Sequence, residues 1–141
     1  MARNGAAFTA EAEKALNRSL IFGFGKSQKF QDAADAFMKA GNAYKLTAEY
    51  TAAGQSFLRA SDCFQKADSG NSDVLNSVVE AGNCFKMGND LPKAVEAFSQ
   101  AIMAYEDAQR YGQCAKYQKE VAEIYEGNGD YNGAIACYQK V

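Results

Sequence analysis

The sequence predicts an all-α protein in which helical hairpins follow one another to form a solenoid. Two observations support this fold class. Apolar and small residues recur at intervals of 20 or 21 residues along most of the 141-residue chain, and polar or glycine-containing breaks separate the recurring segments. Each segment has the length of one helix and a short turn, so a hairpin of two helices takes about 40 residues.

Aromatic residues define the repeat. One position of the repeat is occupied by Phe37, Phe57, Val78, Phe98, Gln118 and Tyr138. Seven residues later, two turns along the same helix face, come Tyr44, Phe64, Phe85, Tyr105 and Tyr125. Between these two series lie Ala40, Ala60, Ala81, Ala101 and Val121. A third series opens the units with Phe30, Tyr50, Leu91, Tyr111 and Tyr131. Together these spacings form the apolar stripe of an amphipathic helix.

The breaks between the stripes give the expected helix boundaries. Asp68–Asn71, Asn89–Pro92 and Gly127–Asp130 combine helix-stopping and helix-starting residues. The helices are expected near residues 6–19, 30–46, 49–67, 72–88, 91–107, 111–127 and from 131 onward. Short turns make successive helices antiparallel, so residues 1–141 should form one helical-repeat domain. The register would place another aromatic residue near position 145, so we expect the chain to end inside a helix and to show some tendency to self-associate.

Composition argues against several function classes. With 15 Lys and Arg against 17 Asp and Glu, the chain lacks the basic excess of a nucleic-acid-binding protein. Histidine is absent and the cysteines form no CxxC pair, so no enzyme, metal or cofactor chemistry is indicated. The longest apolar run at the N-terminus spans six residues, which is too short for a signal peptide or membrane span, and we expect a cytosolic protein. We interpret four cysteines as small buried residues: Cys63, Cys84, Cys114 and Cys137.

One apolar segment, a loop over residues 20–27, lies outside the repeat. Its large apolar side chains are Leu20, Ile21, Phe22 and Phe24. Gly23 and Gly25 oppose helix formation, and Arg18, Lys26 and Lys29 flank the segment. Such a loop can enter a lipid headgroup region while the cations meet anionic phospholipid. It can equally fold back and cap the first hairpin.

The hairpins resemble the tetratricopeptide repeat (TPR), whose small and aromatic residues are matched at Ala94, Phe98 and Ala101. The resemblance implies a right-handed, TPR-like superhelix. Two helices here take about 40 residues rather than the ordinary repeat's 34 or so, which should change the curvature of the superhelix.

Two asparagines provide an alternative function. Asn42 and Asn83 lie in matching Ala-Gly-Asn triplets. In peptide-binding TPR domains an asparagine at this position can hold a ligand backbone or a terminal carboxylate, usually with a lysine one turn earlier. Met38 and Val79 stand at that earlier position here, so the cation is missing. Even without that cation, the matching triplets leave a peptide-binding scaffold of the chaperone or co-chaperone type as an alternative function.

Basic residues recur on the last helices. Lys116 and Lys119 lie one turn apart, Arg110 precedes them, and Lys93 and Lys86 lie on the two preceding elements. Equivalent positions of successive helices line up in a solenoid, so these cations can form a narrow stripe facing an acidic, elongated partner.

Five strings along the chain support a closer resemblance. They are Leu20–Gly25 followed by Lys26-Ser27, then Ala40–Lys45, Ala52–Phe57, Ala81–Lys86 and Ala122–Glu126. In order and spacing these strings resemble the soluble NSF attachment proteins, the SNAP family, over nearly the whole chain. The match corresponds to the N-terminal portion of such a protein.

The resemblance implies an adaptor with no enzymatic activity and no cofactor. Family members are cytoplasmic, associate peripherally with anionic membranes, and bind the assembled SNARE four-helix bundle. They recruit the AAA+ ATPase NSF, which disassembles the bundle after fusion. The family's ATPase-stimulating end lies beyond Val141, so we expect the chain to bind weakly and not to stimulate the ATPase.

Site residues follow from the same resemblance. The family's membrane-attachment loop is matched by Leu20, Ile21, Phe22 and Phe24. Lys116 matches a basic SNARE-contacting position, and Arg110 matches another less closely. Lys93 and Lys86 extend the predicted SNARE contact as members of the basic stripe.

Overall fold

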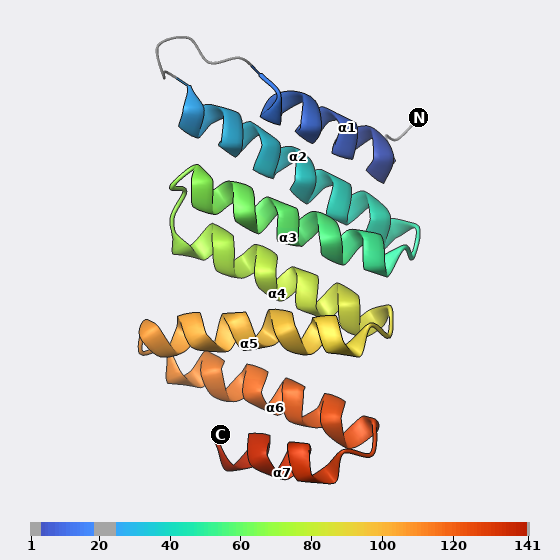
Figure 1. The fold of residues 1–141 in the computed structure, drawn as a ribbon, viewed down its shortest axis with the longest axis vertical. Coiled ribbons are helices and arrows are strands. Elements are labelled where there is room, and N and C mark those ends of the chain that lie inside the picture. The colour runs from blue at the N-terminus through green and yellow to red at the C-terminus, as the bar shows by residue number, and fades with distance from the viewer. Residues whose placement is uncertain (1–3, 19–24, 141) are drawn as a thin grey trace.

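The computed structural model describes residues 4–18 and 25–140, which form seven α-helices and no strand (Figure 1). The helices are α1 (Gly5–Leu16), α2 (Lys26–Leu46), α3 (Tyr50–Lys66), α4 (Asn71–Met87), α5 (Leu91–Asp107), α6 (Tyr111–Gly127) and α7 (Tyr131–Gln139). Successive helices are antiparallel and follow one another along the long axis of the molecule (Figure 1), with the principal contacts between consecutive helices. The predicted solenoid of helical hairpins is confirmed. None of the described helices has the length and apolar character needed to span a membrane.

The prediction was wrong at the first connection. Helix α1 ends at Leu16 rather than near residue 19, and α2 begins at Lys26 rather than near residue 30. Lys26 and Ser27, which were predicted to close the 20–27 loop, are the first residues of α2. The start of α2 is held from outside the helix, because the Ser27 hydroxyl donates a 2.7 Å hydrogen bond to the carbonyl of Ala67. This long-range contact is not visible in the sequence.

Five turns between helices share one geometry. Each contains a residue in the left-handed conformation: Ala48, Asp68, Asn89, Gln109 and Gly129. The N–H of the following residue donates to the carbonyl of an aromatic residue five positions earlier, at 2.8 to 3.1 Å. The five accepting residues are the second aromatic series, Tyr44, Phe64, Phe85, Tyr105 and Tyr125. This is the Schellman arrangement that ends many helices. Here the left-handed position is occupied by glycine in only one of the five turns, at Gly129.

Aromatic rings pack against glycines of neighbouring helices. Phe37, Phe57, Phe85 and Phe98 are almost completely buried, and so are the alanines between the first two series. A Cβ atom at Gly41 would fall 2.6 Å from the ring of Phe57, and one at Gly54 would fall 2.7 Å from the ring of Phe85. The absence of a side chain therefore lets adjacent helices approach closely around each ring.

The repeat weakens toward the C-terminal helices. In α6, Tyr117 is buried next to the predicted position, Gln118, and its ring stacks on Phe98 at 5.6 Å and on Tyr105 at 5.8 Å between centroids. In the third series, Tyr111 and Tyr131 are 64% and 65% exposed, so that stripe is not buried throughout. Each is the first residue of its helix, at an edge of the array.

The interpretation of the cysteines is only partly correct. Cys63, Cys84 and Cys114 are buried, whereas Cys137 is half-buried. The exception lies on α7, the last described helix, where no described helix packs against the outer side.

Candidate functional site

Three even-numbered helices each present one strip of polar side chains, which are exposed except for half-buried Glu80 and Glu120. Residues spaced by four and then three positions lie on one side of a helix. On α2, α4 and α6 these strips are Asp35, Lys39 and Asn42; Asn76, Glu80 and Asn83; and Lys116, Glu120 and Glu123. Exposed apolar side chains, Leu46 and Met87, follow the first two strips by one turn. We call the surface formed by the three strips the even-helix face.

Ion pairs join neighbouring helices of this face, through lysines that lie one turn after the first two strips. Lys45 of α2 pairs with Glu80 of α4 at 3.2 Å, and Lys86 of α4 pairs with Glu120 of α6 at 2.7 Å. The two pairs occupy equivalent positions of the repeat. Each lysine reaches past the intervening odd-numbered helix, and the ammonium of Lys45 lies 6.0 Å from the ring centroid of Phe57 in α3. The even-numbered helices are therefore neighbours on one face of the solenoid.

A corresponding pair marks the opposite face. Arg59 of α3 contacts Glu13 of α1 at 3.2 Å, and its guanidinium lies 4.3 Å from the ring centroid of Phe37 in α2. Odd-numbered helices thus approach one another across the even-numbered helix between them.

Lys86 and Lys116, two of the predicted SNARE-contacting residues, lie at the even-helix face. Lys86 is bound to Glu120, but both side chains are partly exposed, and such surface pairs stabilise a fold by roughly 0–1 kcal/mol. Lys116 is exposed and lies 5.3 Å from the ring centroid of buried Tyr117. Among the described residues it has no carboxylate partner, so its charge faces solvent.

The other two predicted contacts lie elsewhere. Lys93 lies in the first turn of α5, pairs with Asp90 at 3.6 Å, and lines a small groove together with Leu58 of α3. Arg110 precedes α6 at the opposite edge of the array, with its guanidinium 5.6 Å from the ring centroid of Tyr105. The structure therefore places the four cations at three locations rather than in one stripe.

A groove of about 520 Å³ lies on the even-helix face between α2, α4 and α6. Its lining includes Asn83, Lys45, Lys86 and Glu120. A peptide clamp usually has its lysine one turn before the asparagine, whereas here Lys86 lies one turn after Asn83 and Lys45 comes from α2. Asn42 is exposed but does not line this groove. Burial raises the pKa of the Cys84 thiol in its lining to about 11.

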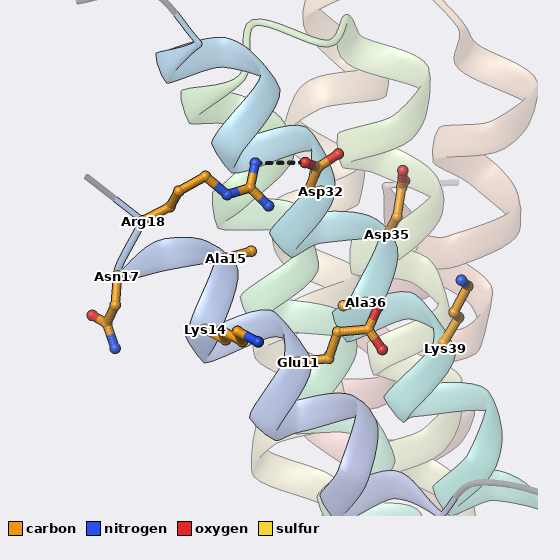
Figure 2. Close-up of a pocket in the computed structure, with 9 residues that line it drawn as sticks. All are labelled: Glu11, Lys14, Ala15, Asn17, Arg18, Asp32, Asp35, Ala36 and Lys39. Carbon is orange, nitrogen blue, oxygen red and sulfur yellow. Dashed lines mark hydrogen bonds and ion pairs between the residues drawn. The ribbon is translucent and has the colours of Figure 1, made fainter. Parts of the chain in front are cut away.

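A second groove, of about 940 Å³, separates α1 from α2 (Figure 2). Ala15 and Ala36 form its base, and Arg18 reaches across to pair with Asp32 at 2.8 Å. This hydrogen-bonded pairing, together with a hydrogen bond from Gln28, lowers the pKa of Asp32. Arg18, expected to flank a membrane loop, is thus bound to a carboxylate. The sequence did not reveal this groove, because its two walls are separate helices.

The four apolar membrane candidates cannot be placed. Leu20, Ile21, Phe22 and Phe24 lie outside the described residues. In the part of the chain that the structure does describe, no group of acidic or cysteine side chains could hold a metal ion.

The fold and this face define a class of protein, a helical-repeat scaffold that presents residues from successive helices on one surface. Comparison with known proteins identifies the family. The family model described as "Soluble NSF attachment protein, SNAP" matches residues 3–141, and the chain belongs to that family.

Individual relatives support the same family assignment. An alpha-soluble NSF attachment protein from Vitis vinifera is 31% identical over 98% of this chain and 46% of the relative. The protein of the same name from Saccharomyces cerevisiae is 38% identical over 84% of this chain and 41% of its own length. The Homo sapiens protein is 34% identical over 95% of this chain and 46% of its own length. The chain therefore spans about half the length of the relatives it matches.

Proposed function

We propose that this chain is the N-terminal portion of a SNAP-type adaptor in vesicle trafficking, which binds assembled SNARE complexes and membranes and recruits NSF. The observation that supports this proposal most strongly is the family match over residues 3–141. Relatives are named as NSF attachment proteins and, in Komagataella phaffii, as a vesicular-fusion protein. The adaptor works by binding alone, in the cytoplasm and at membrane surfaces, without catalysis, cofactor or nucleic acid.

The even-helix face is the proposed SNARE-binding surface. A four-helix bundle is a long rod, and a rod lying across successive helices meets equivalent positions of the repeat. Lys116 offers an unpaired cation to an acidic rod, and Lys86 can exchange Glu120 for a carboxylate of the partner at little cost in stability. Arg110 and Lys93 are proposed as contacts at the margins of this surface.

A binding assay with the preassembled soluble SNARE bundle tests this surface. Lys116→Glu should weaken binding about tenfold at low salt, and the difference should shrink as salt is raised. The matched control is Lys66→Glu, which makes the same charge change on α3, where Lys66 pairs with Asp62. Unchanged binding of Lys116→Glu, or an equal loss in the control, would show that the assigned face is wrong.

Membrane attachment is proposed for Leu20, Ile21, Phe22 and Phe24, and flotation with anionic liposomes tests it. The double variant Phe22→Ser, Phe24→Ser should lose flotation, because two large apolar anchors are removed. A matched double variant, Tyr111→Ser, Tyr131→Ser, removes two exposed aromatic residues elsewhere and should still float. Equal flotation of both variants would leave the loop without a membrane role.

NSF recruitment is proposed for the adaptor as a whole. Because this chain spans about half the length of its relatives, we expect the 141 residues alone not to stimulate the ATPase activity of NSF. Stimulation by this chain at the level of a full-length relative would contradict that expectation.

The alternative function, a peptide-binding scaffold, is supported by the α2–α4–α6 groove. Asn83 lies there beside Lys45 and Lys86, which could together hold a carboxylate. Titration with short acidic peptides would favour this alternative if Asn83→Ala reduced the affinity while Asn42→Ala, outside the groove, did not.

A further inference from the structure

The start of α2 and the end of α3 bring lysines together around one aromatic ring. The ammonium group of Lys29 in α2 lies 5.4 Å from the ring centroid of half-buried Phe30. The ammonium group of Lys66 in α3 lies 5.6 Å from the same centroid. Lys26, the first residue of α2, is exposed one turn before Lys29 on the same side of the helix. We call Lys26, Lys29 and Lys66 the Phe30 cluster.

Two contacts fix the position of the Phe30 cluster. The hydrogen bond from the Ser27 hydroxyl to the carbonyl of Ala67 holds the first turn of α2 beside the end of α3. The Phe30 ring packs against the buried residues shared by α1, α2 and α3. Both helix ends lie at the same edge of the array (Figure 1). Cations from segments 40 residues apart therefore form one surface.

Positive charge exceeds negative charge in this cluster. Lys66 pairs with Asp62 at 3.1 Å, but both side chains are more than half exposed, and such a pair opens at little cost. Neither Lys26 nor Lys29 has a carboxylate partner among the described residues.

The nearest acidic residues of α2 do not offset this charge. Its first turn contains no acidic side chain. Asp32, the first carboxylate of the helix, already accepts hydrogen bonds from Arg18 and Gln28. Like charges that share one ring repel one another, so an anion between them would be bound favourably.

Phosphate monoesters fit the chemistry of the cluster. Ammonium groups donate charge-assisted hydrogen bonds to phosphate oxygens. A monoester carries about −1.5 to −2 charge at neutral pH and offers three acceptor oxygens, so one group can neutralise two lysines. The phosphodiester of phosphatidylserine carries a single charge and offers fewer free oxygens. The cluster should therefore prefer monoesters.

The chain places this cluster next to the proposed membrane anchors. Phe24 precedes Lys26 by two positions in the sequence. Two residues span at most about 7 Å, so a chain anchored through Phe24 keeps the start of α2 at the depth of the lipid headgroups.

We propose that the Phe30 cluster binds the phosphomonoester of an anionic lipid headgroup, such as that of phosphatidic acid or a phosphorylated phosphoinositide. This inference rests on the proposed membrane attachment and adds selectivity to it: the apolar anchors enter any bilayer, and the lysines choose among headgroups. Binding of the soluble SNARE bundle does not involve this site.

Flotation with two sets of liposomes of equal total charge tests the selectivity. One set contains phosphatidylserine and the other phosphatidylinositol 4-phosphate. The unmodified chain should bind the second set roughly fivefold more tightly. The double variant Lys29→Gln, Lys66→Gln should bind both sets equally and still float. The control is Lys119→Gln, Lys140→Gln, which removes the same charge from exposed positions elsewhere and should keep the preference.

Three results of this assay would overturn the proposal. They are equal binding of the two liposome sets by the unmodified chain, a preference that persists in Lys29→Gln, Lys66→Gln, and an equal loss of preference in the control. Inorganic phosphate in the flotation buffer separates the two possible sources of the phosphate group. The preference should survive it, and its loss would mean that free phosphate rather than a lipid fills the site.

A soluble headgroup separates this inference from membrane attachment. Inositol 1,4-bisphosphate added to the Phe22→Ser, Phe24→Ser variant should shift the amide resonances of Lys29, Phe30 and Lys66, because the site does not need the anchors. This readout holds even if that variant still floats, a result that would contradict only the proposed anchors. Shifts spread evenly over the chain, or equal shifts after Lys29→Gln, Lys66→Gln, would overturn the lysine site itself.

Discussion

The ring of Phe98 in α5 lies against the backbone of Gly82 in α4, so closely that a Cβ atom at Gly82 would fall 2.7 Å from Cε1 of the ring. Phe98 is fully buried and cannot move away, because Tyr117 stacks on its other side. This contact and its equivalents at Gly41 and Gly54 set the distance between neighbouring helices.

Gly82→Ala should therefore destabilise the protein. The clash with Phe98 should cost about 1–3 kcal/mol, more than the roughly 1 kcal/mol that alanine gains over glycine in a helix. Urea unfolding followed by circular dichroism measures the difference. Gly112→Ala is the control, because a Cβ there meets nothing within 4 Å, and it should leave stability unchanged or raise it. If the clash is the cause, the double variant Gly82→Ala, Phe98→Leu should be more stable than the sum of the two single losses in free energy of unfolding predicts. Additive losses would show that the clash with Phe98 is not the cause.

The turn after α2 offers a stabilising change. Ala48 adopts φ of +58°, a conformation that favours glycine. Ala48→Gly should raise the free energy of unfolding by about 0.5–1 kcal/mol. The reverse change, Gly129→Ala in the equivalent turn, should lower it by a similar amount, since φ is +80° and a Cβ there meets nothing within 4 Å. Thermal unfolding measures both, and shifts of the same sign would contradict this explanation.

The Arg18–Asp32 pair should make stability depend on pH in the acid range. The pKa of Asp32 is lowered in the folded state, so the pair stabilises the fold above the ordinary aspartate pKa and loses its effect as pH falls below about 4. Asp32→Asn should cost at most roughly 1 kcal/mol at pH 7, because the pair is well exposed. The free energies of unfolding of the two proteins should converge as the pH falls through the lowered pKa of Asp32. A constant difference across the range would mean that the carboxylate acts through packing instead.

The four cysteines should differ in how fast their thiols are alkylated. Burial raises the pKa of Cys84 to about 11, so at pH 8 only about one thiol in a thousand is ionised. Burial also raises the pKa of Cys63 and Cys114, whereas half-buried Cys137 is accessible. Iodoacetamide at pH 8 should label Cys137 first, with the others reacting only after unfolding. Mass spectrometry of peptides reads the order, and rapid native labelling of Cys84 would contradict its burial.

The sequence predicts most helix boundaries well, because local residue patterns determine them. The helices from α3 to α6 begin and end within a residue or two of the expected positions, and the rings of Phe37, Phe57, Phe85 and Phe98 are buried as the period indicates. The start of α2 was missed, since the Ser27–Ala67 hydrogen bond joins positions 40 residues apart.

The candidate site was less predictable than the fold. Lys86 and Lys116 were predicted as site residues and both lie at the even-helix face, but the partner of Lys86, Glu120, lies two helices along the chain. Which side chains meet across an intervening helix depends on how the hairpins stack. A single sequence contains no signal for the resulting distance between alternate helices. The predicted helix boundaries place Lys93 on the fifth helix, but they do not indicate that odd-numbered and even-numbered helices present different faces.

The Lys45–Glu80 and Lys86–Glu120 pairs also have a mechanical meaning. Bending this solenoid away from its even-helix face moves α2, α4 and α6 apart, and these reversible cross-links are stretched first. A ligand that draws either lysine to its own carboxylates removes a restraint on bending at the moment of binding.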